Sequence, residues 1–182
     1  VVNGLSAPVM DAPRAPGAVV HVFGTPTGWH VDGAGVRHGE RLRLTFDELP
    51  LPGAHNALNL CGALTALEAA GVELPPLGET LALFEPLAHR LQAVLEHDGT
   101  TWVDDSISTT PESAIAATES FPERELLLIG GGEDRGQDYT DLARVLAERE
   151  VTVFGIAKNG STGPALIAAA QAAGVPTERA RV

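Results

Sequence analysis

Cysteine, lysine and aromatic residues are scarce in this sequence of 182 residues. Its one cysteine, Cys61, cannot form an intrachain disulfide, so we expect a reducing compartment, the cytoplasm. Aromatic residues make up 4% of the chain and hydrophobic residues 44%, so the core must be built largely from Leu, Val and Ala. We find no signal-peptide pattern and no apolar run long enough to cross a bilayer, and we expect no membrane insertion.

Positive charge is scarce as well, because 12 Lys and Arg residues oppose 24 Asp and Glu residues, for a formal net charge of −12. Nucleic acids and anionic membranes bind to basic surfaces, so both classes of partner are excluded. A small polyanionic ligand remains compatible, since a local group of cations can oppose the overall charge. His21, His30 and His38 lack the spacing of metal ligands, and we expect no metal site among them.

Several catalytic motifs are missing. The sequence has neither the GxGxxG spacing of dinucleotide-binding proteins nor the GK[ST] of a P-loop. Ser106 and Ser108 have no histidine at a recognisable spacing, so no catalytic triad can be assembled and we name no catalytic residue. The chain begins without methionine and ends at Arg181-Val182 as a strand begins, so we expect a fragment.

The first half predicts short β-segments followed by one long helix. Residues 19–23 and 41–46 have the patterns of a buried and a half-buried strand, and residues 24–39 are rich in turn formers. A helix starts within 51–59 and runs to about Ala70, where Gly71 ends it. Residues 73–80 contain two prolines and are the expected linker, with a short helix at about 80–84.

The second half predicts a Rossmann-like α/β domain. A hairpin is expected around Asp98-Gly99. After it, helices and strands alternate, which is typical of parallel βαβ units with helices on both faces of a sheet. The expected helices cover 110–120, 142–149 and 164–173, and the expected strands cover 125–130 and 151–156.

A polar loop between the hairpin and this domain is the first candidate site. Asp105, Ser106 and Thr109 follow the strand that ends near Asp104 and precede a helix with Pro111 in its first turn. Such a loop can bind a ribose, a phosphate or a carboxylate, although an ordinary capped loop explains the spacing equally well. We expect a capping box between Thr109 and Glu112.

Three further positions carry amides or cations. Asn56 and Asn59 are three residues apart and project from one side of the first helical turns, where they are either ligands or simple capping residues. Arg135 follows the glycines after the strand at 125–130, and its planar guanidinium suits a carboxylate or a phosphate. Arg90, next to His89, is either a surface residue or a phosphate ligand, and Lys158 is either solvated or functional.

Together these motifs resemble the Mur ligases, cytoplasmic ATP-dependent enzymes that add amino acids to the UDP-muramoyl peptide precursor of peptidoglycan. The resemblance covers nearly the whole chain and rests on GxHNxxN at 53–59, the HR pair at 89–90 and DSxxT at 105–109. The GGxxR loop at 131–135 and the LEHxG sequence at 95–99 look most like the glutamate-adding branch. By comparison, residues 1–72 are the end of a central ATP-binding domain, and 81–182 are most of the C-terminal Rossmann-like domain.

The resemblance implies a role for each candidate. Asn56 and Asn59 look like adenine contacts, Arg90 like the arginine at the phosphates of ATP, and Asp105 like the ribose carboxylate. Ser106, Thr109 and Arg135 fall at positions that bind glutamate. The substrates would be UDP-N-acetylmuramoyl-L-alanine, glutamate and ATP, with the P-loop and the ligands of Mg²⁺ outside these residues. A monomer active in cell wall biogenesis, and so in cell shape and cell division, is expected.

The branch that adds D-glutamate typically has lysine after the Asp-Ser pair, where this chain has Ile107, and lysine where it has Arg135. The run Ser-Ile-Ser-Thr-Thr-Pro looks instead like a subgroup that adds L-glutamate, which we favour. A D-glutamate ligase, a nucleotide-binding relative without catalytic activity and a folate polyglutamate synthase-like enzyme are the alternatives.

Overall fold

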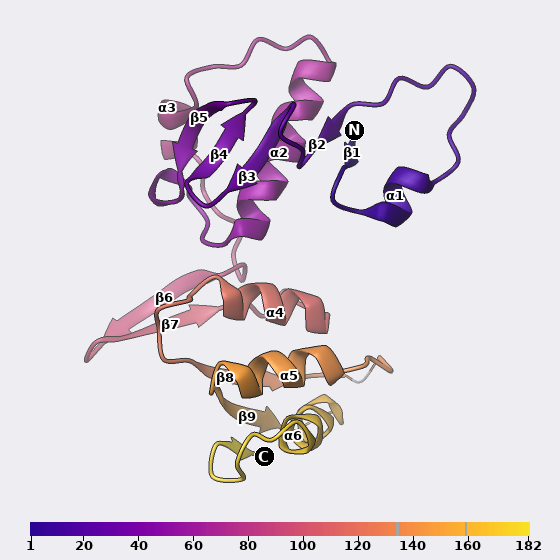
Figure 1. Cartoon of the computed structure of the whole chain (residues 1–182). Coiled ribbons are helices and arrows are strands. Elements are labelled where there is room, and N and C mark those ends of the chain that lie inside the picture. Colours follow the sequence, from indigo (N-terminus) through magenta and orange to yellow (C-terminus); the bar gives the residue numbers. More distant parts are fainter. Residues whose placement is uncertain (134, 159) are drawn as a thin grey trace. The chain divides into compact units, whose positions relative to one another are not determined.

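The computed structural model describes residues 1–133, 135–158 and 160–182 (Figure 1). The chain forms two compact units, Val1–Asp104 and Asp105–Val182.

The first unit contains seven strands in three small sheets among its described residues. A parallel pair consists of β1 (Val2–Asn3) and β2 (Val22–Phe23). An antiparallel sheet consists of β3 (Trp29–Asp32), β4 (Gly35–His38) and β5 (Arg41–Thr45). An antiparallel hairpin consists of β6 (Gln92–His97) and β7 (Thr100–Asp104). The helices are α1 (Ala7–Asp11), the 3-10 turn η1 (Phe46–Glu48), α2 (Ala54–Ala69) and α3 (Leu77–Ala82).

The core of this unit forms where α2 packs against β3 and β4. The side chain of Trp29 is 1% exposed; its ring stacks on His38 at 4.6 Å, and the guanidinium of Arg43 lies over it at 5.4 Å. Cys61 and Leu64 of α2 complete this core, and their separation of three residues puts both on one face of the helix. At Gly62, a Cβ would come within 3.2 Å of the Phe23 ring, so glycine allows β2 to approach the helix closely.

Two predictions in this unit need correction. The predicted strand 19–23 shortens to Val22–Phe23, and Val19 is exposed, because only the last two residues pair with β1. The short helix begins at Leu77 instead of about residue 80, since Leu77 packs into the core around Trp29. The predicted linker 73–80 therefore includes packed residues, and its assignment as a boundary between domains stays a prediction.

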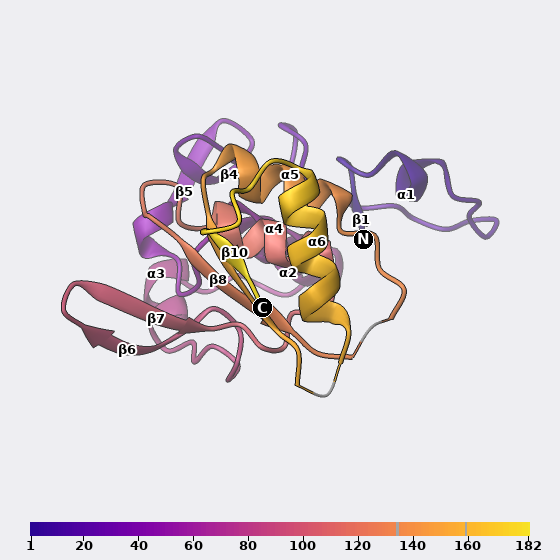
Figure 2. The same cartoon turned by 90° about the horizontal axis from the view of Figure 1, so that it is seen from below.

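The second unit is built around a parallel three-stranded sheet in the order β10-β9-β8. Its elements are α4 (Pro111–Glu119), β8 (Leu127–Gly131), α5 (Thr140–Glu148), β9 (Thr152–Ile156), α6 (Thr162–Ala172) and β10 (Ala180–Arg181). The crossover through α6 joins the parallel strands β9 and β10, and Figure 2 shows α6 beside β10. The predicted Rossmann-like α/β arrangement is confirmed.

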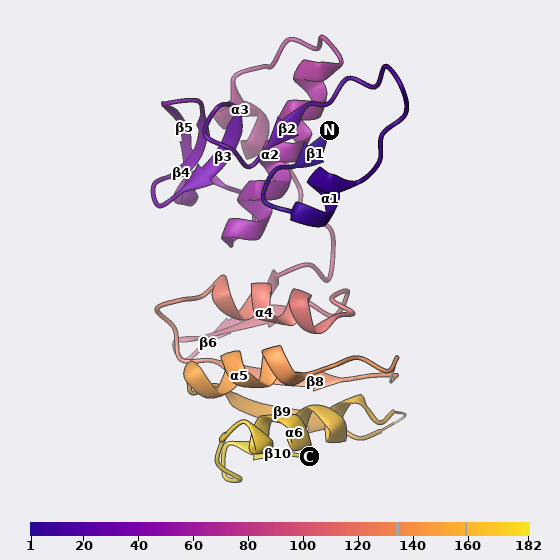
Figure 3. The same cartoon turned by 45° about the vertical axis from the view of Figure 1, so that its right-hand side comes forward.

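The prediction of helices on both faces of this sheet is wrong for the described residues. Figure 3 shows α5 and α6 on the same side of the sheet. On that face Val153 packs with residues of these two helices, namely Leu142, Leu146, Leu166 and Ile167. Side chains of β8 and β9 that project to the other face are exposed, namely Leu127, Ile129, Phe154 and Ile156. The physical reason is the strand order, because two crossovers of the same hand that continue in one direction put both helices on one face.

Candidate functional site

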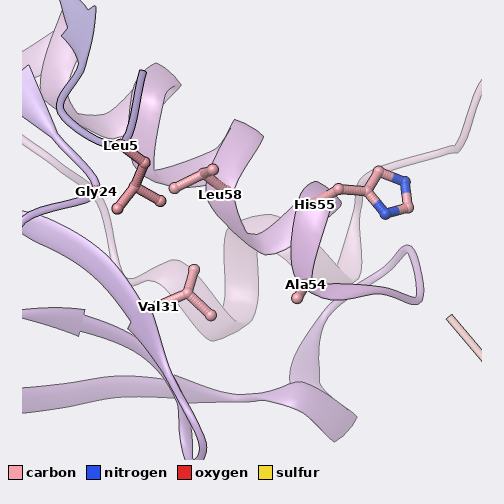
Figure 4. Close-up of a pocket in the computed structure, with 6 residues that line it drawn as sticks. All are labelled: Leu5, Gly24, Val31, Ala54, His55 and Leu58. Atoms are coloured by element: carbon pink, nitrogen blue, oxygen red, sulfur yellow. The ribbon is translucent and has the colours of Figure 1, made fainter. Parts of the chain in front are cut away.

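The first turns of α2 border a shallow recess of about 310 Å³. The helix follows Gly53, whose φ of +97° favours glycine. Lining residues come from the N-terminal segment, β3 and α2, namely Leu5, Gly24, Val31, Ala54, His55 and Leu58 (Figure 4). Figure 4 shows the apolar side chains of Leu5, Leu58 and Val31 grouped together and the His55 ring pointing away from them. The recess is at the small end of the range for ligand pockets.

Asn56 and Asn59 lie in different environments. Neither is the N-cap of α2, which is Gly53, so the alternative that they are capping residues is not what the structure has. Asn56 is 9% exposed, and its side-chain amide nitrogen donates to the carbonyl of Pro52 at 2.7 Å. Asn59 is exposed. The amide of Asn59 is therefore accessible to a ligand, whereas Asn56 holds the chain before the helix in place.

Arg90 lies in the loop that enters the β6–β7 hairpin and is half-buried. Its neighbours His89 and Leu91 both have left-handed backbone, with φ of +65° and +43°. The side chain of Arg90 makes no hydrogen bond or ion pair with any residue that the structure describes. It is a cation available for an anionic ligand.

Asp105 opens the second unit in a tight turn. Its Oδ2 accepts from the hydroxyl of Ser108 at 2.5 Å, and its backbone carbonyl accepts from the N–H of Ser108 at 2.9 Å. These two hydrogen bonds fix the carboxylate relative to the loop. Ser106 is exposed in the same turn, as is Ile107 with 46% exposure.

The predicted capping box between Thr109 and Glu112 is wrong. The N-cap of α4 is Thr110, whose Oγ1 accepts from the backbone N–H of Ser113 at 3.3 Å. Pro111 is the first helical residue, and the residue directly before proline has extended backbone suited to a cap. Thr109 is therefore left outside the helix, exposed, with a hydroxyl that no cap uses.

Arg135 and Lys158 lie in the two loops that leave the carboxyl ends of β8 and β9. Backbone of these loops is in close contact, since a Cβ on Gly160 would collide with the carbonyl oxygen of Gly132. Both cationic side chains are exposed. Asp134, beside Arg135, lies outside the described residues. The carboxyl edge of a parallel sheet is where such folds bind ligands, which keeps Arg135 as a candidate.

The described part of the chain has neither a metal-binding group nor a reactive thiol. No group of three or more His, Cys, Asp or Glu side chains that could hold a metal ion is present there. Burial raises the pKa of the Cys61 thiol to about 11, so that the thiol stays protonated and is a poor nucleophile. None of the described helices is long and apolar enough to span a membrane.

One contact near the site was not predicted. Nδ1 of His89 donates to Oδ2 of Asp104 at 2.8 Å, across fifteen positions of sequence. No periodicity or short motif indicates such a pair, because it depends on the register in which β7 returns beside β6.

Comparison with known proteins gives a consistent picture. A family profile described as "Mur ligase, glutamate ligase domain" matches residues 89–182. A protein of Xanthomonas oryzae is 40% identical over 162 residues, which cover 88% of this chain and 35% of that protein. A protein of Salinispora tropica is 41% identical over 174 residues, covering 88% and 38%. One of Micromonospora is 39% identical over 195 residues, covering 100% and 41%.

All three relatives carry the name UDP-N-acetylmuramoyl-L-alanine--L-glutamate ligase. The chain spans 35% to 41% of their length. The similarity extends over residues of both units, because the matched segments cover most or all of the chain.

Proposed function

Because this chain belongs to the Mur ligase family, we propose that the whole protein joins glutamate to UDP-N-acetylmuramoyl-L-alanine in an ATP-dependent step of peptidoglycan precursor synthesis. The observation that carries the proposal is an identity of about 40% with relatives named for this reaction, over nearly all of the chain. The protein would act as a monomer in the cytoplasm and serve cell shape and cell division.

The reaction proceeds in two transfers. An oxygen of the alanine carboxylate attacks the γ-phosphorus of ATP and expels ADP, giving an acyl phosphate. The amine of glutamate then attacks the acyl carbon, phosphate leaves, the nitrogen loses a proton and an amide bond forms. The contribution of the protein is to position the reactants and to stabilise charge. Magnesium supplies charge neutralisation in such transfers. The described residues of this chain contain no group of side chains that could hold the metal ion.

The nucleotide is assigned to four residues. Asn59 is exposed and follows Leu58, a lining residue of the recess, in the sequence; its amide suits the exocyclic amine and ring nitrogen of adenine. Asn56 would reach adenine through its side-chain oxygen or its second N–H, since one N–H donates to the carbonyl of Pro52. Arg90 supplies the positive charge for the phosphates, and Asp105 accepts hydrogen bonds from the ribose hydroxyls.

The incoming glutamate is assigned to the loops of the second unit. Arg135 can bind one carboxylate through two parallel hydrogen bonds, and the exposed hydroxyl of Thr109 can donate to a second. Ser106 is assigned to the same glutamate site. Ile107 offers no charge where D-glutamate enzymes of the family typically have lysine. The positive charge that binds the carboxylates of glutamate therefore comes from Arg135 and not from position 107. The amine must point at the acyl phosphate, so this change of position favours the enantiomer whose carboxylates then reach Arg135.

The test is the ratio of kcat/KM values for L- and D-glutamate, measured on the whole protein with UDP-N-acetylmuramoyl-L-alanine as the acceptor. We expect a preference for L-glutamate of about tenfold or more, because a misplaced carboxylate loses a charge-assisted hydrogen bond. Ile107→Lys is expected to reduce this preference. Leu83→Lys, at an 85% exposed side chain, is the matched control for added charge and should leave the ratio unchanged.

The other outcomes identify the alternatives. A preference for D-glutamate would make the protein an ordinary D-glutamate ligase in which Ile107 and Arg135 are neutral substitutions. ATP binding without ligation of either enantiomer would make it a non-catalytic nucleotide-binding relative.

A further inference from the structure

Arg90 lies between two residues that hold an unfavourable backbone conformation. The backbone φ is +65° at His89 and +43° at Leu91. Side chains clash with their own backbone in this left-handed region, and a leucine there is a clear outlier. Strain on both sides of one residue persists only where neighbouring contacts hold it.

Three contacts hold this segment against the β6–β7 hairpin. Nδ1 of His89 donates to Oδ2 of Asp104 at 2.8 Å, and the N–H of His89 donates to Oε1 of Gln92 at 3.0 Å. Leu91 is buried, with 8% exposure. Gln92 and Asp104 face each other in the strand pairing, so both hydrogen bonds fasten the loop to the open end of the hairpin.

The His89–Asp104 pair does little for the stability of the fold as a whole. The side chain of His89 is 61% exposed and that of Asp104 30%, and pairs so accessible to water contribute little to global stability. What the His89–Asp104 pair determines is local, namely the direction in which Arg90 leaves the main chain. Arg90 has no partner of its own among the described residues, so this direction is set by the backbone.

We infer that His89 and Asp104 are positioning residues that hold Arg90 ready for the phosphates of a nucleotide, an inference that rests on the proposed function. Arginine loses much side-chain freedom when it binds, and a backbone fixed beforehand reduces the loss that binding itself must overcome. Asp104 also directly precedes Asp105. The residue that holds His89, and with it the backbone of Arg90, is therefore the sequence neighbour of the residue proposed to bind the ribose.

The experiment measures the affinity of the whole protein for ATP by calorimetry, with and without Arg90. His89→Ala is expected to weaken ATP binding about five- to tenfold, because a disordered arginine must be fixed by the ligand. In an Arg90→Ala background the same change should alter the affinity by less than about twofold, since there is no guanidinium left to position. An equal loss in both backgrounds, no loss in either, or no measurable ATP binding would overturn the inference.

Matched variants separate the hydrogen bond from the backbone. His89→Asn retains a donor and a residue type that tolerates left-handed backbone, so it should restore affinity to within about twofold. His89→Gly retains only the backbone freedom and should give an intermediate value. His97→Ala is the control, because His97 forms an exposed pair with Asp98 at the other end of the same hairpin, at 3.2 Å, and should have no effect.

Two parallel measurements complete the design. The melting temperature should be the same for His89→Ala and the unmodified protein, and a large decrease would indicate a structural role and overturn the inference. Glutamate ligation by the unmodified protein reports on the proposed function alone. Coupling between positions 89 and 90 in ATP affinity, without any ligation, would leave the positioning role standing and reject the ligase.

Discussion

Among single residues, Asp105 is the one whose geometry depends most closely on its own loop. The hydroxyl of Ser108 donates to one of its carboxylate oxygens and holds the side chain against the loop. A carboxylate fixed in this way presents a defined acceptor to two neighbouring ribose hydroxyls, without the cost of ordering a mobile side chain.

We therefore expect Asp105→Ala to lower kcat/KM for ATP in the whole protein by a factor that corresponds to about 2–4 kcal/mol, as for loss of a charge-assisted contact. Ser108→Ala removes one hydrogen bond to the carboxylate but keeps the carboxylate itself, so its effect should be smaller. Steady-state kinetics with ATP as the varied substrate measure both. An Asp105→Ala enzyme within about threefold of the unmodified one, or roughly 0.7 kcal/mol, would remove Asp105 from the nucleotide site.

The two asparagines show where spacing stops being informative at this scale. Their separation of three residues predicted that both project from one side of α2, and the structure has Asn56 among the buried residues of this helix and Asn59 exposed. Which of them remains accessible is decided by burial, because Asn56 turns its amide towards Pro52 while Asn59 stays exposed. That difference arises from the backbone before the helix and has no signature in the spacing.

At the scale of elements, the start of α4 separates a structural threonine from a candidate ligand. Thr110 caps the helix through the N–H of Ser113, and Thr109 precedes it without a role in the helix. Thr110→Ala should lower the free energy of unfolding by about 1 kcal/mol, the usual cost of losing a cap. Thr109→Ala should change it by less than about 0.5 kcal/mol.

Urea unfolding of the whole protein measures this difference, and glutamate kinetics on the same two variants test the assignment of the ligand. The two variants should differ in opposite ways. Thr109→Ala should raise KM for glutamate with little change in stability, whereas Thr110→Ala should lower stability. A larger loss of stability for Thr109→Ala than for Thr110→Ala would mean that the capping box predicted from the sequence is present after all.

Elements of the second unit also depend on contacts distant in sequence. Arg149, at the end of α5, donates through its guanidinium to the carbonyl oxygens of Thr118, Phe121 and Pro122 at the end of α4. Carbonyl groups at a helix C-terminus lack partners within the helix, so this arginine supplies donors that the local sequence does not. The helix propensity of 110–120 predicted α4 correctly but could not indicate what completes its end.

At the scale of the whole molecule, the 182 residues contain neither a P-loop nor, in their described part, a metal-binding group. Transfer of the γ-phosphoryl group requires both phosphate-binding backbone and a metal ion. The chain expressed alone should therefore release no phosphate from ATP in the presence of acceptor and glutamate. Phosphate release above that of a heat-inactivated sample, with the whole protein as the positive control, would contradict this prediction.

The sequence alone was sufficient for what depends on local physics. Helical spacing, turn formers and the Asp98-Gly99 pair predicted α2, α4, α5, α6 and the β6–β7 hairpin to within a few residues, because propensity and hydrophobic period act over short distances. The motifs at 53–59, 89–90 and 105–109 were enough to indicate the family that the comparison supports.

Tertiary structure decided the rest, since those features depend on which distant segments meet. The strand order β10-β9-β8 puts both crossover helices on one face of the sheet, although the helical patterns are compatible with either face. The register of β6 and β7 brings Asp104 to His89 and so fixes the backbone on which Arg90 stands. A one-dimensional pattern specifies what each segment prefers, whereas strand order and register depend on the packing of all segments at once.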